Sequence, residues 1–188
     1  MEALKRVESG LSVPEIAEEL ALARPERIIS LVLATTSVGP YMLKISILQA
    51  WARQALAGMS PMTFFQIMLP FMFNDRCFED PQVVEMAVGT IAARSSTPPH
   101  ILARQMTACA EHDARDRIGR ITAPTLVLAG KEDPFVPFSL SQELAASIPG
   151  AQLKVLEGGG HAPHDDGWRR GGRQPARATG PARVLRTS

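Results

Sequence analysis

The sequence predicts an α/β protein with a partial parallel sheet of about three strands that carries an inserted helical cap. Three short apolar runs, each bounded by turn residues, predict the strands: IISLVLATT, APTLVLAG and AQLKVLEG. Apolar runs without polar alternation are typical of strands that are covered on both faces of a parallel sheet. Between the first run and the second, residues 37–117 show helical patterns only. A helical segment is therefore expected to interrupt the sheet.

An amphipathic helix is predicted before the first strand. In residues 16–28, Ile16, Leu20 and Ala23 recur at helical spacing and share one face. The charged residues Glu15, Glu18, Glu19 and Arg24 lie off that face. Pro25 ends the helix because proline lacks the amide hydrogen that continues it. A helix that leads into a buried strand is half of a βαβ unit, which again indicates a parallel sheet.

The inserted segment is rich in methionine, proline and phenylalanine. Its predicted helices run from Leu43 to Ala57, Pro61 to Phe73, Pro81 to Ala93 and Pro99 to Cys109. Its methionine and phenylalanine side chains favour a plain hydrophobic core over an acyl-binding pocket, although both remain open. His112, beside Asp113 and Asp116, is interpreted as a surface feature, because one histidine among solvated charges is a poor metal site.

Polar side chains follow the second and third strands at the point where each strand ends. Asp133 follows the run that ends at Gly130, and His161 follows the glycine-rich turn after the third run. The carboxyl ends of neighbouring parallel strands meet at one edge of a sheet, where catalytic groups gather. A carboxylate that accepts a bond from one imidazole nitrogen leaves the other nitrogen able to take a proton. The sequence therefore predicts that Asp133 and His161 face each other as two members of a catalytic triad.

Ser12 is the candidate nucleophile, and two interpretations of it remain open. Gly10 and Ser12 match the start of a G-x-S-x-G turn, which presents a serine between a strand and a helix. Pro14 stands in place of the second glycine, and the charged stretch MEALKRVES is unsuited to a strand buried on both faces. The motif SVPE also fits a capping box in which Ser12 is the N-cap residue and Glu15 bonds back to it. The helix-cap interpretation is favoured.

Several stretches resemble the α/β-hydrolase fold. Its C-terminal third is matched by PTLVLAGKEDPFVP and AASIPGAQLKVLEGGGHAPH, which contain Asp133 and His161. The helix and strand after the nucleophile are matched by LALARPERIISLVLATT, and the exit from the helical cap by DARDRIGRITAPTLVL. The resemblance covers residues 16–164 and is closest to 3-oxoadipate enol-lactonase-like esterases and lactonases. It implies that Ser12, His161 and Asp133 hydrolyse a small apolar ester or lactone without a metal or cofactor.

The resemblance also implies a division of the chain. Residues 1–36 correspond to a remnant of the hydrolase core, 37–117 to the cap, and 118–164 to the core with the acid and histidine loops. No stretch corresponds to the first strands of the fold or to the loop that donates one oxyanion-hole amide. We therefore expect a truncated hydrolase whose isolated chain has little or no esterase activity. The alternative is a catalytically inactive protein that at most binds a ligand or partner.

Composition restricts the expected partners and location. The chain has 188 residues and a net charge of +1, which gives no reason to expect nucleic acid or an anionic membrane. It has no signal-peptide pattern and no apolar stretch of membrane-spanning length, so a cytoplasmic location is expected. Cys77 and Cys109 fit no zinc or redox spacing and are expected to be buried free thiols. Residues 165–188, rich in arginine and glycine, are expected to form a disordered tail.

Overall fold

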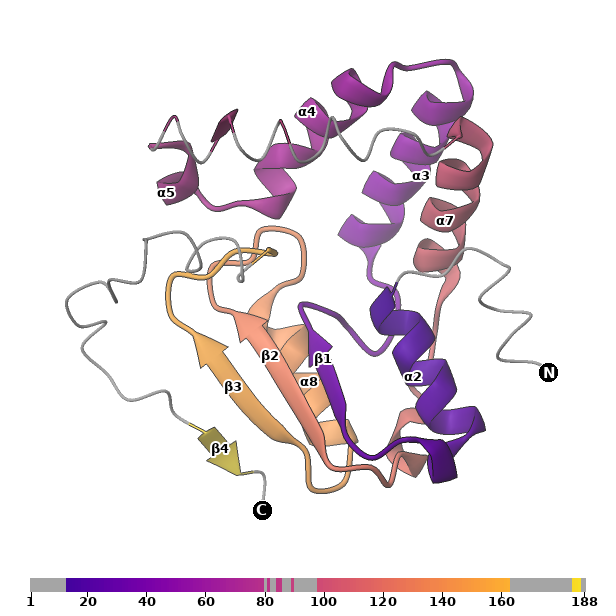
Figure 1. Ribbon diagram of the computed structural model, residues 1–188, viewed down its shortest axis with the longest axis vertical. Helices are drawn as coiled ribbons and strands as arrows, with labels where there is room; N and C mark the ends of the chain where they lie inside the picture. The colour runs from indigo at the N-terminus through magenta and orange to yellow at the C-terminus, as the bar shows by residue number, and fades with distance from the viewer. Residues whose placement is uncertain are drawn as a thin grey trace.

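The computed structural model describes residues 13–79, 81, 84–85, 89, 98–162 and 184–186. Three parallel strands form its centre, and they lie side by side in chain order (Figure 1). They are β1 (Leu31–Ala34), β2 (Thr125–Gly130) and β3 (Gln152–Leu156). The predicted α/β class with a partial parallel sheet is confirmed.

β1 differs from the prediction in length and in burial. The sequence pattern indicated residues 28–36 with both faces covered, whereas the strand comprises Leu31–Ala34. Leu31 and Leu33 are buried, but Val32 is 58% exposed. The reason is that α2 (Val13–Ala23) and α8 (Phe138–Ser147) pack on the side of Leu31 and Leu33. Within the described residues, the opposite face of β1 has no comparable cover.

The main core lies between the sheet and the helices α2 and α8. A short 3-10 helix, η1 (Pro25–Arg27), connects α2 to β1, and it begins at Pro25 because proline fits the first turn of a helix. A second one, η2 (Ile118–Arg120), leads into β2. The three strands, α2, α8 and η2 each contribute buried side chains to this core. They include Ala21, Leu33, Ile118, Val127, Leu144 and Leu153.

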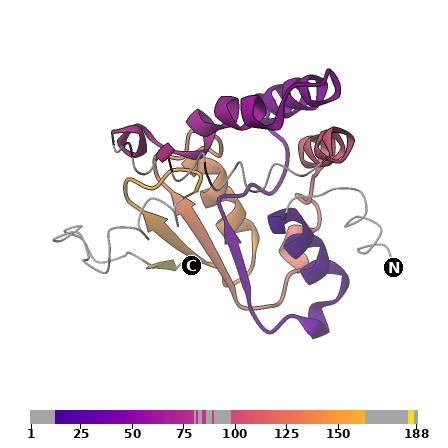
Figure 2. The same cartoon turned by 45° about the horizontal axis from the view of Figure 1, so that its top comes forward.

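The segment between β1 and β2 is helical in its described part. It contains α3 (Met42–Leu56), α4 (Pro61–Met72), α5 (Asp75–Phe78) and α7 (Pro99–Glu111). These helices lie beyond the ends of the strands, with α3 and α7 packed side by side (Figures 1 and 2). α5 lies between the helices predicted to end at Phe73 and to begin at Pro81, and it was not predicted because a helix of one turn is too short to show a period in sequence. The predicted helix over residues 81–93 lies largely outside the described residues.

A second hydrophobic core fills this helical segment. Phe64, Trp51 and Met106 are buried in it, and Cys109 is a buried free thiol, as expected. Met59, Phe65, Met68, Phe71 and Met72 pack against it, which favours the plain-core interpretation of these side chains. Met62 differs, since it is an exposed hydrophobic residue. None of the described helices has the length and apolar character needed to cross a lipid bilayer.

One short strand lies in the stretch that was expected to be a disordered tail. β4 (Val184–Arg186) pairs antiparallel with β3, where Leu153 is aligned with Leu185. For these three residues the expectation is wrong. The physical reason is that the outer edge of β3 offers unpaired backbone groups, and Val184 and Leu185 form a short apolar run that fits a strand. The remainder of residues 165–188 lies outside the described part of the chain.

Candidate active site

Asp133 and His161 meet at the end of the sheet where β2 and β3 finish. Nδ1 of His161 lies 2.9 Å from Oδ2 of Asp133. The proximity expected from sequence is confirmed, whereas the catalytic role of each residue remains a prediction. An ionised carboxylate only accepts hydrogen bonds, so the imidazole nitrogen is the donor.

The second oxygen of the Asp133 carboxylate fixes its orientation. Oδ1 accepts the backbone N–H groups of Phe135 and Val136 at 2.8 and 2.7 Å. Asp133 is buried, so these bonds replace the water that its carboxylate loses on folding. The turn after β2 therefore directs Oδ2 toward His161.

The loops that carry Asp133 and His161 are joined backbone to backbone. The N–H of Glu132 donates to the carbonyl of Gly159 at 3.1 Å. Gly130 makes this approach possible, because a Cβ at that position would lie 2.3 Å from the carbonyl oxygen of Gly160. The glycine-rich turn thus brings His161 to the acid, as the sequence indicated.

The geometry determines which proton transfers His161 can perform. Because Nδ1 donates to Asp133, the neutral ring carries its lone pair on Nε2. The His161 side chain is 20% exposed, which gives a bound molecule access to the ring. A histidine held in this way can act as a general base, because a neighbouring carboxylate is able to stabilise the imidazolium that would form.

An aromatic cluster connects His161 with the helical segment. The ring of Phe135 meets the His161 ring edge to face, with 5.1 Å between centroids. Trp51 of α3 stacks on Phe135 at 5.8 Å, and Phe71 of α4 packs edge-on against both. One side of His161 is therefore bordered by apolar surface.

Tyr41 places a buried hydroxyl near Asp133. It is the N-cap residue of α3, and its hydroxyl has no hydrogen-bond partner among the described residues. Burial, and to a smaller extent the negative charge of Asp133, raises the pKa of Tyr41. The phenol therefore remains a proton donor. Sequence reasoning missed this residue, because a lone tyrosine after a strand carries no recognisable motif.

Ser12 lies outside the described residues, so neither interpretation of it is tested. α2 begins directly after it, at Val13, and runs antiparallel to β1 (Figure 1). The start of α2 is therefore at the end of the sheet where the strands finish, which is also the end that carries Asp133 and His161.

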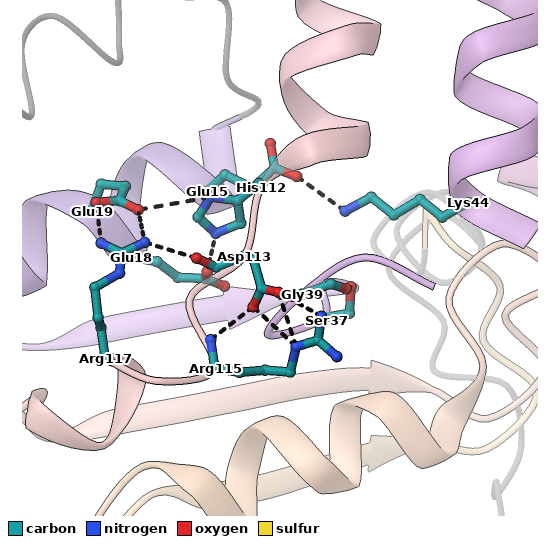
Figure 3. A network of polar contacts seen from close by, with 10 residues as sticks. All are labelled: Glu15, Glu18, Glu19, Ser37, Gly39, Lys44, His112, Asp113, Arg115 and Arg117. Carbon is teal, nitrogen blue, oxygen red and sulfur yellow. Dashed lines mark hydrogen bonds and ion pairs between the residues drawn. The ribbon is translucent and has the colours of Figure 1, made fainter. Parts of the chain in front are cut away.

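The acidic face of α2 is buried and paired rather than solvated (Figure 3). Lys44 of α3 donates to Oε1 of Glu15 at 3.1 Å, and Nε2 of His112 lies 2.9 Å from Oε2 of Glu18. The expectation that His112 is a surface residue is wrong, since it is only 5% exposed. The physical reason is that Glu18, distant in sequence, supplies the partner that makes burial of the imidazole favourable.

Glu19 attaches α2 to the segment before β2. Its two oxygens accept hydrogen bonds from Arg117 at 2.8 and 2.9 Å, the bidentate arrangement that suits a guanidinium group. Sequence periodicity missed this pair, because periodicity separates polar from apolar positions but does not separate a solvated glutamate from a paired one. The three glutamates of α2 thus hold the helix that follows Ser12.

The protonation of Glu18 is shifted by its surroundings. Burial raises its pKa, and the hydrogen bond and charge of His112 oppose the rise. Oε1 of Glu18 has no hydrogen-bond partner among the described residues. A buried, incompletely bonded carboxylate is unfavourable in its charged form, which is the physical cause of the rise in the pKa of Glu18.

The described residues contain no cluster with the composition of a metal site. No group of three or more His, Cys, Asp and Glu side chains in this part of the chain could hold a metal ion. His100 is exposed, and His164 lies outside the described residues.

A cleft of about 790 Å³ runs along α7 and contains neither Asp133 nor His161 in its wall. Its charged lining is of both signs, including Arg104 and Glu111, and indicates no ligand class.

Comparison with protein families gives a match that spans most of the chain. The family described as "Alpha/beta hydrolase family" matches residues 10–170. The chain is 30% identical over 148 residues to a protein named "Putative carbamate hydrolase RutD" from Pseudomonas syringae pv. syringae. It is 35% identical over 103 residues to a 2-hydroxy-6-oxo-6-phenylhexa-2,4-dienoate hydrolase from Burkholderia cepacia. These matches cover 77% and 53% of this chain, respectively.

Solved structures show the same arrangement of strands and helices. A hydrolase from Pseudomonas aeruginosa PA01 superposes with a TM-score of 0.71 at 28% identity, over 88% of this chain and 63% of that one. The enol-lactonase from Burkholderia xenovorans LB400 gives a TM-score of 0.67 at 23% identity, over 77% and 54%. The predicted partial α/β-hydrolase fold is thereby confirmed. The chain spans 55% of the length of the carbamate hydrolase relative and 35% of the dienoate hydrolase.

Proposed function

Because the chain belongs to the alpha/beta hydrolase family, we propose that it hydrolyses a carboxylic ester or lactone by acyl transfer to water. Ser12 is the nucleophile, His161 the general base and Asp133 the residue that orients His161. The observation that carries the proposal is the 2.9 Å hydrogen bond between His161 Nδ1 and Asp133 Oδ2.

The reaction has two halves. In the first, Nε2 of His161 takes the proton of the Ser12 hydroxyl as Oγ attacks the carbonyl carbon, and then protonates the leaving oxygen as the ester bond breaks. In the second, His161 activates water in the same way, and the acid is released with Ser12 restored. Asp133 remains ionised throughout and stabilises the imidazolium formed in each half.

The surroundings of His161 support a small apolar substrate. Phe135 contacts the imidazole ring, and Trp51 and Phe71 pack behind Phe135 as part of the hydrophobic core of the helical segment. Apolar walls with a few polar groups are typical of sites for small molecules. Similar proteins include one named as a carbamate hydrolase and one as an enol-lactonase. Esters, lactones and carbamates share a carbonyl carbon that one nucleophile can attack, so all three classes belong in the test.

An inactive binding protein is the alternative. The charged stretch MEALKRVES and Pro14 are poorly suited to a working nucleophile turn, and the SVPE pattern gives Ser12 a role as a helix cap. In that case the apolar surface beside His161 holds a ligand without turnover.

The test combines turnover with identification of the nucleophile. The unaltered chain, Ser12→Ala and His161→Ala are compared on p-nitrophenyl acetate, a γ-lactone and an aryl carbamate. Each is also treated with a fluorophosphonate probe, and the labelled residue is located by mass spectrometry. The sequence alone predicts little or no activity, but the hydrogen-bonded Asp133–His161 pair leads us to expect slow hydrolysis that falls in both variants, with the probe on Ser12. Ser46→Ala, an exposed serine of α3, is the control that should change nothing.

Two outcomes separate the alternatives. Equal rates in all four proteins and no probe attachment would overturn the proposal in favour of a binding protein. Turnover that depends on His161 while Ser12 is unlabelled and replaceable would overturn the role of Ser12 alone.

A further inference from the structure

Asn74 reaches from the helical segment to both loops of the Asp133–His161 pair. Its Nδ2 donates to the carbonyl oxygen of Gly158 at 2.6 Å and to Oε2 of Glu132 at 3.3 Å. Both partners are acceptors, which fixes the orientation of the amide. Asn74 is 8% exposed. One buried amide therefore bridges the loop that holds the acid and the loop that holds the histidine.

The position of Asn74 at the start of α5 does not account for the orientation of its amide nitrogen. Asn74 is the N-cap residue of α5, yet its side chain makes no capping hydrogen bond to that helix. Asparagine is among the residues preferred at an N-cap, because its side-chain oxygen accepts an amide hydrogen of the first turn. The amide nitrogen is directed to the two loops, so its contact with them is the role that the structure shows.

The carbonyl that Asn74 holds belongs to the turn that leads to His161. The N–H of Gly159 donates to the carbonyl of Leu156 at 3.1 Å, which closes this turn. Gly158 has a φ of 74°, a conformation that glycine adopts without strain. The bond from Asn74 fixes the plane of the peptide after Gly158, three residues before the imidazole.

A second contact holds the loop on the other side of His161. The N–H of Ala162 donates to the carbonyl of Met72 at 2.9 Å. Met72 is the last residue of α4, two residues before Asn74. The α4–α5 junction therefore forms hydrogen bonds with the histidine loop on both sides of His161, at Gly158 and at Ala162.

We propose that Asn74 is a positioning residue for His161 and holds the Gly158 turn so that Nδ1 meets the Asp133 carboxylate. The inference rests on the proposed function in one respect, since the pair that Asn74 positions is the proposed catalytic pair. Removal of the amide leaves the partly buried Gly158 carbonyl without this donor and frees the turn to rotate. The His161–Asp133 hydrogen bond then lengthens or is lost.

Nuclear magnetic resonance measures this bond directly and does not require turnover. With histidine labelled by ¹⁵N, His161 is identified by the signal missing from His161→Ala. The unaltered chain should show a low-field Nδ1 proton and the Nδ1–H tautomer, both typical of an imidazole bonded to a carboxylate. Asn74 is the only asparagine in the sequence, so selective labelling gives a single side-chain amide, whose protons should exchange slowly with solvent.

The variants are Asn74→Ala, which removes the amide, and Asn74→Asp, which keeps its size but places an acceptor against the Gly158 carbonyl. In both, we expect loss of the low-field Nδ1 resonance and a mixture of His161 tautomers. Gln66→Ala, which removes an exposed amide from α4, should leave the His161 spectrum unchanged. If Asn74→Ala does not fold, Asn74→Asp and the exchange rate of the native amide still decide the matter.

The proposal is overturned by an unchanged His161 tautomer and proton shift in the folded Asn74 variants, or by fast exchange of the native Asn74 amide. It is also overturned if the unaltered chain lacks the bonded Nδ1 proton. Failure of the proposed function appears separately, as absent turnover and absent labelling of Ser12 with the His161 spectrum intact.

Discussion

Gly130 and Gly160 approach so closely that no side chain fits between them. A Cβ added to Gly130 would lie 2.3 Å from the carbonyl oxygen of Gly160, and 2.4 Å from that of Gly159. Both contacts are with backbone, which cannot move aside as a flexible side chain can. The end of β2 and the histidine loop can therefore pack backbone against backbone only because Gly130 has no side chain.

The substitution Gly130→Ala should displace the histidine loop. Overpacking of this kind typically lowers the free energy of unfolding by about 1–3 kcal/mol. We expect a loss at the upper end of that range, measured by urea denaturation. The control is Gly119→Ala, where the nearest atom to the added Cβ is 3.3 Å away. Similar stability of the two variants would contradict the close approach.

Two substitutions of Asp133 should differ in stability. Asp133→Ala removes the acceptor of the buried N–H groups of Phe135 and Val136, and each unsatisfied group costs about 1–3 kcal/mol. Asp133→Asn keeps an oxygen that can accept both bonds, so it should lose less. Equal losses in urea denaturation would show that the turn after β2 does not depend on the Oδ1 contacts.

Glu18 should make stability depend on pH. Its pKa is raised by burial, so the folded chain retains a proton that the unfolded chain releases once pH exceeds the ordinary value of about 4.3. The contribution of Glu18 to the free energy of unfolding is therefore present below that pH and is lost as pH rises through the folded pKa. The charged groups that influence Glu18 are His112, Glu15 and Lys44.

Urea denaturation of the unaltered chain and Glu18→Gln between pH 4 and pH 8 isolates this contribution. The variant should become more stable relative to the unaltered chain as pH rises. Glu26→Gln, at an exposed position, is the matched control and should show no such trend. A stability difference for Glu18→Gln that does not vary with pH would contradict the raised pKa.

The ion pairs in α2 and in the turn that follows it should differ in their contribution to stability according to burial. Glu19→Ala removes the bidentate partner of Arg117, and we expect a loss of about 2 kcal/mol because Arg117 is left only partly solvated. Glu26→Ala removes the exposed partner of Arg24, and exposed pairs contribute about 0–1 kcal/mol. Thermal unfolding of the two variants gives the comparison, and equal shifts would show that the Glu19 pair adds little.

The strands and the Asp133–His161 contact were predictable because each depends on local patterns. An apolar run marks a buried strand, and parallel strands end at a common edge. Asp133 and His161 follow neighbouring strands, so the fold class alone brought them near each other. The start and end of each strand were less certain, as β1 shows, because its length depends on which segments cover it.

The ion pairs of α2 were not predictable from such patterns. Glu18 and His112 are far apart in sequence and meet only when α2 and the segment after α7 pack together. The local sequence around each residue predicts a solvent-exposed side chain, and burial becomes favourable only once the partner is present. Asn74 was missed for the same reason, because its acceptors at Glu132 and Gly158 come from distant loops.

The central claim is that the hydrogen-bonded pair of Asp133 and His161 performs acyl hydrolysis. The most direct test is the kcat/KM of the unaltered chain on p-nitrophenyl acetate, compared with those of His161→Ala and Asp133→Asn. General base catalysis contributes about 10²–10⁴ in rate, so His161→Ala should lower a slow but measurable kcat/KM by at least about 10². Asp133→Asn should cause a comparable loss, because the amide favours the wrong tautomer of His161. A kcat/KM that is the same in all three proteins would contradict the claim.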